Sequence, residues 1–180
     1  MKINVNQTQV LVIDIQEKLY PHIYKNEKVL ENSIRLIKGL KLLKTPFTLN
    51  EQYPKGIGST INPIKELLNG EKVYEKVTFS CCQTEATMEQ IKNQNKKFVI
   101  VFGIEAHVCV MQSVLDLLEA GFIPVVITDC IGSRKPHDKD SAIQRMIQSG
   151  AIPSTYESIL FELCVSSKND VFKEISKIVK

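Results

Sequence analysis

The stretch FVIVFGIEAHVCVMQSVLDLLEAG, residues 98–121, contains a complete connection from a strand to a helix. Residues 98–102 (FVIVF) are an apolar run with charged residues before it and a glycine after it, which predicts a buried strand. Residues 107–120 are apolar over most of a helical circumference, and Gly121 stands where helices commonly end. A buried strand that leads directly into a buried helix is typical of a parallel α/β sheet.

The rest of the chain repeats this alternation of short apolar runs and longer helical patterns. We expect strands at residues 10–13, 47–49, 72–75, 98–102, 123–128 and 151–153, and helices at 27–44, 60–68, 84–93, 107–120 and 139–148, with two more helices after them. This pattern predicts a doubly wound, Rossmann-like α/β/α sandwich of three layers with a six-stranded parallel sheet. A chain of 180 residues suffices for one well-buried core, so we expect a single domain over residues 1–180.

Composition argues against several classes of protein. The formal net charge is only +3 and the lysines are scattered, so we expect no nucleic-acid partner. No apolar run approaches the roughly 18 residues of a membrane span, and Asp14 interrupts the first apolar run, so we expect a cytoplasmic protein without a membrane segment. The five cysteines are irregularly spaced, which predicts free thiols. No G-x-G-x-x-G or P-loop motif supports a nucleotide-binding domain.

Ligands of doubly wound sheets bind at the carboxyl ends of the strands, and chemically capable residues follow several of the expected strands here. Asp14 follows the first strand, Lys76 the third, and Cys109 lies in the first turn of the helix after the fourth. Unpaired N–H groups at a helix start lower the pKa of a thiol, so we expect a thiolate at Cys109. Asp14 could accept the thiol proton, and Lys76 would stabilise both anions. Taken singly, a solvated lysine, a capping aspartate and a core cysteine are commoner.

Three segments decide between these interpretations: VLVIDIQ (10–16), KVTFS (76–80) and VFGIEAHVCV (101–110). Their order and spacing resemble the signature segments of the isochorismatase-like cysteine hydrolases. The similarity covers nearly the whole chain, including VVITDCIGSR (125–134) and SGAIPSTYESILFEL (149–163). The resemblance implies a six-stranded parallel sheet between helices and a catalytic triad of Asp14, Lys76 and Cys109.

The same resemblance implies a special backbone geometry before the cysteine. Members of the family usually have a cis peptide bond at the position of Ile104 and Glu105. By resemblance, this bond aims the backbone N–H of Glu105 beside that of Cys109, and the two N–H groups form an oxyanion hole. His107 is a less convincing base, because residues two apart in a helix do not face each other.

The branch of the family follows from the loop after the second strand. Nicotinamidases carry metal-binding histidines there, whereas NEQYPKGIGS (50–59) offers Asn50, Glu51 and Gln52 and no histidine, which is a poor zinc site. We therefore expect no metal and no cofactor. Isochorismatases proper cleave a vinyl ether and generally lack the cysteine, so Cys109 favours covalent chemistry. The combined pattern resembles the branch that includes the isochorismatase-domain-containing proteins.

These observations predict a hydrolase that acts on a small amide-like substrate through a thioester at Cys109. Two alternatives remain open: a non-catalytic oligomeric scaffold or partner-binding protein on the same fold, and an isochorismatase-type ether hydrolase. We expect the substrate pocket to be lined by Gln16, Gln52, Tyr53, Phe79 and Ile131. We also expect a homo-oligomer, with the apolar segment of residues 156–163 as an interface patch.

Overall fold

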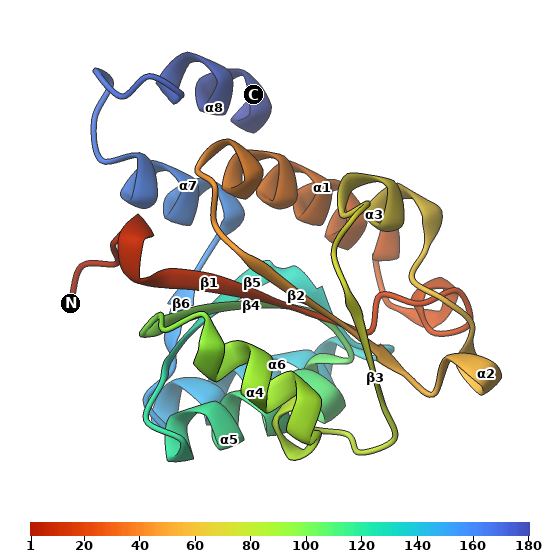
Figure 1. Cartoon of the computed structure of the whole chain (residues 1–180). Coiled ribbons are helices and arrows are strands. Elements are labelled where there is room, and N and C mark those ends of the chain that lie inside the picture. The colour runs from red at the N-terminus through yellow and green to blue at the C-terminus, as the bar shows by residue number, and fades with distance from the viewer.

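The computed structural model describes residues 1–180 and shows a six-stranded, all-parallel sheet (Figure 1). The strand order is β3-β2-β1-β4-β5-β6, so the direction of winding reverses between β1 and β4. The strands are β1 (Thr8–Ile13), β2 (Phe47–Gln52), β3 (Val73–Lys76), β4 (Phe98–Ile104), β5 (Ile123–Gly132) and β6 (Ile152–Ser154).

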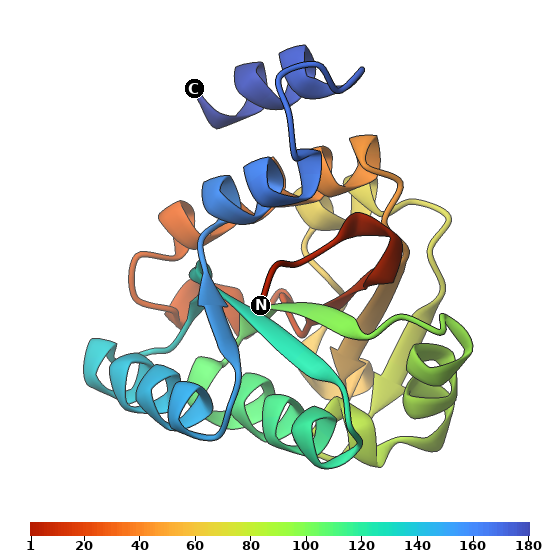
Figure 2. The same cartoon turned by 90° about the vertical axis from the view of Figure 1, so that its left-hand side faces the viewer.

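Helices cover both faces of this sheet, and the predicted three-layer, doubly wound fold is confirmed. In Figure 1, α1, α3 and α7 lie above the sheet and α4, α5 and α6 below it. Figure 2 shows α8 outside α7, and α8 contacts both α1 and α7. The helices are α1 (Asn26–Leu42), α2 (Pro54–Ile57), α3 (Asn62–Leu67), α4 (Glu85–Asn93), α5 (Met111–Glu119), α6 (Pro136–Gln148), α7 (Tyr156–Cys164) and α8 (Phe172–Val179). None of them has the length and apolar character needed to cross a bilayer.

The central strands β1 and β4 are buried at every residue, because a parallel sheet with helices on both faces leaves no side of these strands in water. They form the middle of a hydrophobic cluster of 39 buried residues. The carboxyl ends of β1 and β4 are therefore held rigidly side by side, at the point where ligands of doubly wound folds bind.

Gly103 makes this close approach possible. It pairs with Ile13 across the two central strands and has a φ of 129°, which side chains disfavour. A Cβ at this position would collide with the backbone carbonyl of Ile13. Only glycine therefore lets the end of β4 lie against the residue that precedes Asp14.

Several strands extend further than predicted, and the extra residues are polar. Residues 50–52, expected in a loop, belong to β2, and Lys76 is the last residue of β3 rather than the residue after it. Asp129, expected beyond the fifth strand, lies within β5, which shifts its register against β4 between Val101 and Gly103. Apolar periodicity underestimates such strands because their polar side chains find buried hydrogen-bond partners, as Asn50 does on the carbonyl of Tyr74 (3.2 Å).

The segment expected as an interface patch is not exposed. Ile159, Leu160 and Leu163 on α7 are almost completely buried, and Phe161 packs against Phe172 of α8 with ring centroids 6.3 Å apart. Leu160 closely contacts Gly39 of α1. The aliphatic side chains expected to form an interface patch at residues 156–163 are therefore used within the chain itself, against α1 and α8, and an interface at this segment stays a prediction.

Candidate active site

Asp14 directly follows the fully buried strand β1 and has no exposed surface. Its backbone adopts a positive φ of 52°, and its N–H donates to the carbonyl of Asn50 (3.2 Å). One carboxylate oxygen, Oδ2, accepts a hydrogen bond from Lys76 Nζ at 2.7 Å. The other, Oδ1, is buried and accepts no hydrogen bond. A buried carboxylate needs a partner, and here one oxygen has a partner while the other remains available.

Lys76 is held by four acceptors that surround its ammonium group. Besides Asp14, Nζ donates to Gln52 Oε1 (2.6 Å) and to the carbonyl oxygens of Phe79 (3.0 Å) and Thr78 (3.3 Å). The chain after β3 turns back over the lysine to provide the two carbonyl groups. The Lys76 side chain has no exposed surface, so its charge is fixed at one place beside Asp14.

Cys109 lies in a π-helical turn, Ala106–Val110, that precedes α5. The expected helix at residues 107–120 therefore begins differently from the prediction, with Val110 N–H donating to the carbonyl of Glu105 (3.2 Å). The thiol is 4.0 Å from Gln52 Oε1, and the residue is only 5% exposed. The structure thus brings Asp14, Lys76 and Cys109 together around Gln52.

Ser113 anchors this turn, and sequence reasoning did not identify it. Its hydroxyl donates to the carbonyl of Cys109 (2.7 Å) and accepts from the N–H of Cys81 (2.9 Å). The available signal was a single serine four residues after the cysteine in an otherwise apolar helix face, where a hydroxyl bonds back to the carbonyl at i−4.

The electrostatics of the site differ from the prediction. Burial raises the pKa of Asp14 to about 6, although the charge of Lys76 opposes the rise. Burial by itself lowers the pKa of Lys76, but the negative charges of Asp14, Cys81 and Cys109 outweigh it and the net direction is upward. Burial and the nearby Asp14 charge raise the pKa of Cys109 to about 12. The prediction of a favoured thiolate is therefore wrong, because desolvation and the carboxylate oppose ionisation of the thiol.

The turn between β4 and Cys109 has a free backbone donor. The Ile104–Glu105 peptide bond is cis. The N–H of Glu105 donates to no other group of the chain. The Glu105 carboxylate is held by the guanidinium group of Arg134, with Nε to Oε1 at 2.6 Å and Nη2 to Oε2 at 3.4 Å. Sequence reasoning missed this link, which fixes the side chain of the residue that carries the free N–H.

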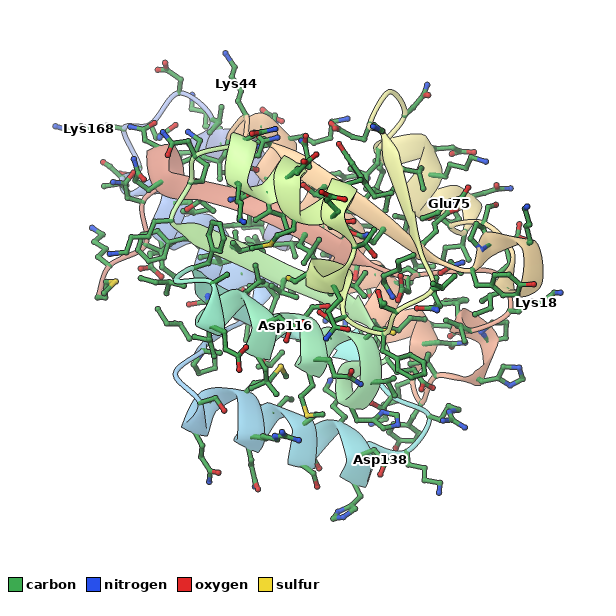
Figure 3. All side chains as sticks on the ribbon, turned by 60° about the horizontal axis from the view of Figure 1, so that its bottom comes forward. Lys18, Lys44, Glu75, Asp116, Asp138 and Lys168 are labelled. Atoms are coloured by element: carbon green, nitrogen blue, oxygen red, sulfur yellow. The ribbon has the colours of Figure 1, made fainter.

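His107 faces away from the thiol. Its Nδ1 is 2.9 Å from Ser133 Oγ, and its Nε2 is 3.9 Å from the carboxylates of both Glu105 and Asp138. Asp138, labelled in Figure 3, stands at the N-terminal end of α6. His107 therefore links the turn that carries Cys109 to the start of α6, and neither of its ring nitrogens is hydrogen-bonded to Cys109.

The remaining residues expected in the pocket have different environments. Tyr53 and Lys76 share the lining of a cavity of about 390 Å³, and the Tyr53 side chain is half exposed. Phe79 also exposes about half of its surface. Gln16 is fully buried, and its amide braces the backbone of Gln52 (2.7 and 2.9 Å). Ile131 is fully buried in the hydrophobic core.

The polar side chains at the end of β2, which were considered as metal ligands, have structural partners instead. Glu51 Oε1 accepts hydrogen bonds from both the N–H and the hydroxyl of Thr60, each at 2.7 Å. Asn50 donates to the hydroxyl of Thr87 (3.0 Å). Nowhere does the structure gather three or more His, Cys, Asp or Glu side chains that could hold a metal ion.

Comparison with known proteins shows which family has this sequence and this fold. A family model described as the isochorismatase domain matches residues 8–158. Isochorismatase family protein 1A of Dictyostelium discoideum is 38% identical over 94% of this chain and 84% of its own length. Two solved structures superpose with a TM-score of 0.94: MAR1 ribonuclease from Caenorhabditis elegans, 37% identical over 99% of this chain and 92% of that one, and YcaC from Pseudomonas aeruginosa with hexane-2,5-diol and covalent acrylamide, 25% identical over 99% and 90%.

Proposed function

Because the chain belongs to the isochorismatase family, whose fold is that of hydrolases, we propose that it is a cysteine-dependent hydrolase of a small amide-like molecule. The catalytic residues in this proposal are Asp14, Lys76 and Cys109. The observation that carries the proposal is the buried Oδ1 atom of Asp14, which has no hydrogen-bond partner. Asp14 forms an ion pair with Lys76, and it is close enough to Cys109 for its charge to raise the pKa of the thiol. A carboxylate with a free acceptor beside a thiol is the arrangement that a general base and its nucleophile require.

In the first half of the reaction, Asp14 accepts the thiol proton as the Cys109 sulfur attacks the carbonyl carbon. The carbonyl oxygen becomes an oxyanion, which the backbone N–H groups of Glu105 and Cys109 stabilise. The free N–H of Glu105 supports this role. Asp14 then returns the proton to the nitrogen, the C–N bond breaks, and ammonia or an amine leaves a thioester on Cys109.

In the second half, Asp14 takes a proton from a water molecule that attacks the thioester. The C–S bond breaks, the acid is released, and the sulfur recovers its proton from Asp14. Lys76 keeps Asp14 ionised in spite of its burial, because the ammonium charge offsets the desolvation of the carboxylate. The three residues supply base, nucleophile and fixed charge, so the mechanism needs no cofactor.

The YcaC structure supports a reactive nucleophile in this fold. Acrylamide adds to nucleophiles through its carbon–carbon double bond, and it is covalently bound in that relative. With 25% identity and a TM-score of 0.94, the relative shares its fold with this chain. We extend the presence of a reactive nucleophile from that protein to this one, with Cys109 as the candidate.

The proposal is tested by ammonia release from a panel of small primary amides, namely acetamide, propionamide, succinamate and nicotinamide. We expect turnover of at least one of them, and none with Cys109→Ala, since nothing else in the site can form the thioester. Cys164→Ala, a buried cysteine at the end of α7, is the matched control and should remain active. Absence of turnover together with unselective iodoacetamide labelling of the thiols would favour the scaffold alternative. Cleavage of a vinyl ether that persists in Cys109→Ala would favour the isochorismatase type.

A second candidate function is RNA hydrolysis, because the MAR1 protein that is 37% identical to this chain is named a ribonuclease. The small net charge of +3 gives it little support. Incubation with a fluorescent single-stranded RNA decides the question. Cleavage by the wild type that is lost in Cys109→Ala would establish this activity at the same site.

We also propose that the protein is cytoplasmic, forms a homo-oligomer and, as an amidase, has no nucleic-acid partner. Five free cysteines suit a reducing compartment. Tyr53, Val77 and Phe79 expose apolar surface beside Lys76, which a second copy would cover. Light scattering at micromolar concentration should give a mass above that of one chain, and a strictly monomeric mass would contradict the assembly.

A further inference from the structure

A separate cavity of about 280 Å³ lies between the start of α1 and the start of α6, and none of the catalytic residues lines it. Val29 and Pro136 contribute apolar surface, while the other lining side chains are mainly polar or charged. Asn32 of α1 and Asp129 of β5 connect two of its walls, because the Asn32 amide donates to the backbone carbonyl of Asp129 (3.0 Å). The cavity is thus built around β5, which packs against α1 on one face of the sheet and α6 on the other.

Asn32 gives this cavity an unsatisfied acceptor. The residue is only 4% exposed, and the hydrogen bond from its Nδ2 fixes the orientation of the amide. Its Oδ1 is buried and accepts no hydrogen bond from the chain. Buried polar atoms are nearly always paired, so this oxygen calls for an N–H or O–H donor from a bound molecule.

The cavity also contains charges of both signs that are not paired with each other. Lys139 on α6 is half-buried, and its ammonium group makes neither a hydrogen bond nor an ion pair. Burial lowers the pKa of this ammonium group, and the charge of Asp129 opposes the decrease only from a distance. The Asp129 carboxylate is half-buried and accepts a hydrogen bond from the N–H of Tyr156 (3.0 Å), but no cation contacts it. Lys25 adds a positive charge to the lining.

From this combination we propose that the cavity binds a small zwitterion of the α-amino acid class. The ligand carboxylate pairs with Lys139 and Lys25, and the ligand ammonium donates to Asn32 Oδ1 and Asp129. A simple anion would satisfy the lysines and leave the buried oxygen of Asn32 unpaired. A simple cation would do the reverse, so a molecule with both groups is needed to satisfy Lys139, Asp129 and Asn32 together. Of the other charged groups in the lining, Lys28 is already paired with Glu31 (2.9 Å) and Asp140 is exposed to solvent.

The position of Ser133 connects this cavity with the active site. Ser133 lines the cavity, is 2% exposed, and places its hydroxyl 2.9 Å from His107 Nδ1. His107 precedes Cys109 by two residues in the same π-helical turn. A ligand that contacts Ser133 therefore changes the hydrogen bond that holds the catalytic turn, and the site acts as an effector site for the cysteine.

Binding is tested by calorimetry with glycine, L-alanine and L-serine as probes, on the wild type and on Cys109→Ala. We expect at least one amino acid to bind at or below roughly 10 mM, and propionate and ethylammonium, which carry one charge each, to bind at least about tenfold more weakly. Lys139→Met and Asp129→Asn should each weaken binding about tenfold or more, with folding checked by circular dichroism. Lys173→Met, an exposed lysine of α8, is the matched control and should bind normally. Absence of binding by all three amino acids, or equal binding of alanine and propionate, would overturn the proposal.

Coupling is tested by the rate at which iodoacetamide alkylates Cys109, with and without a saturating amino acid. We expect a change of about threefold or more in the wild type. Ser133→Ala should still bind the amino acid but show no change in rate. Equal rates in the wild type would remove the effector role. Because binding is measured on Cys109→Ala and coupling by alkylation, neither result depends on whether the protein hydrolyses amides.

Discussion

Replacing Asp14 with asparagine should make Cys109 more reactive toward alkylating reagents while it removes hydrolysis. Asparagine has nearly the same shape and can still accept the hydrogen bond from Lys76 Nζ, so the geometry should persist. What disappears is a negative charge that raises the pKa of the Cys109 thiol. The lysine charge then opposes only the burial of the thiol, which the substitution leaves unchanged.

The size of the effect follows from the pKa of Asp14. With that pKa at about 6, the carboxyl group carries a proton in about one molecule in ten at pH 7. In the wild type the thiol ionises readily only in those molecules, because in the others two adjacent negative charges would form. In Asp14→Asn every molecule is in the favourable condition. Alkylation should therefore be about tenfold faster than in the wild type at pH 7, about twofold faster at pH 6, and up to about a hundredfold faster at pH 8.

The assay measures pseudo-first-order alkylation by iodoacetamide between pH 5.5 and 8.5, with mass spectrometry to confirm that Cys109 is the labelled residue. Hydrolysis should fall by about 10²–10⁴ in the same variant, because the general base is lost. Asp170→Asn, the same change at an exposed residue just before α8, is the control and should leave both rates unchanged. A ratio between variant and wild type that is below one, or that does not increase with pH, would show that Asp14 and Cys109 do not share a site in the way described.

Three further predictions concern the buried pair of Asp14 and Lys76 and the metal content of the protein. The difference in free energy of unfolding between Asp14→Asn and the wild type, measured in urea, should move in favour of the variant by up to about 3 kcal/mol as pH rises from 4 to 7, because a pKa raised from 3.8 to about 6 means that ionisation of Asp14 progressively destabilises the folded wild type over this range. A pH-independent difference would contradict this. Lys76→Met should lower the free energy of unfolding by about 3–5 kcal/mol at pH 8, because it leaves the Asp14 carboxylate buried without a partner. The loss should be smaller at pH 5, where Asp14 takes up a proton. Equal losses at both pH values would argue against a charged pair. Purified protein should contain no stoichiometric zinc, iron or manganese by elemental analysis, and a chelator should leave its activity unchanged; one tightly bound transition metal per chain would refute that expectation.

The sequence was sufficient to predict the fold and the side chains that meet at its edge, for reasons that lie in particular residues. Strand β4 is buried at all seven positions, and the π-helical turn and α5 follow it after one residue, so its apolar run is easily recognised in the sequence. Parallel strands bring their carboxyl ends to one edge, which predicts that Asp14, Lys76 and Cys109 are neighbours. Residues 50–52 escaped because their strand is polar, and their partners come from distant parts of the chain.

The protonation state of the site could not be predicted in the same way. A helix start and a nearby lysine both favour a thiolate, and both are visible in the sequence. The depth of burial is not visible there, and it is the largest influence on Asp14 and on Cys109. Likewise, nothing in the sequence indicated that Arg134 holds Glu105 or that His107 binds Ser133, since these contacts depend on how β5 ends beside the turn.

The resulting protonation states restrict how the proposed reaction can begin. With Asp14 near pKa 6 and the thiol near 12, moving the proton to Asp14 before any bond forms would cost at most about 8 kcal/mol, since each pKa unit corresponds to about 1.4 kcal/mol. A turnover of about 10 per second corresponds to a total barrier of roughly 16 kcal/mol, so full ionisation in advance would use up to half of it. If the proton moves while the C–S bond forms, the negative charge passes from sulfur to the carbonyl oxygen and never rests on a buried thiolate. The oxyanion then meets the backbone N–H groups of the turn, where Glu105 has a free donor. The deep burial that disfavours a resting thiolate is therefore compatible with catalysis, provided that proton transfer and attack are coupled.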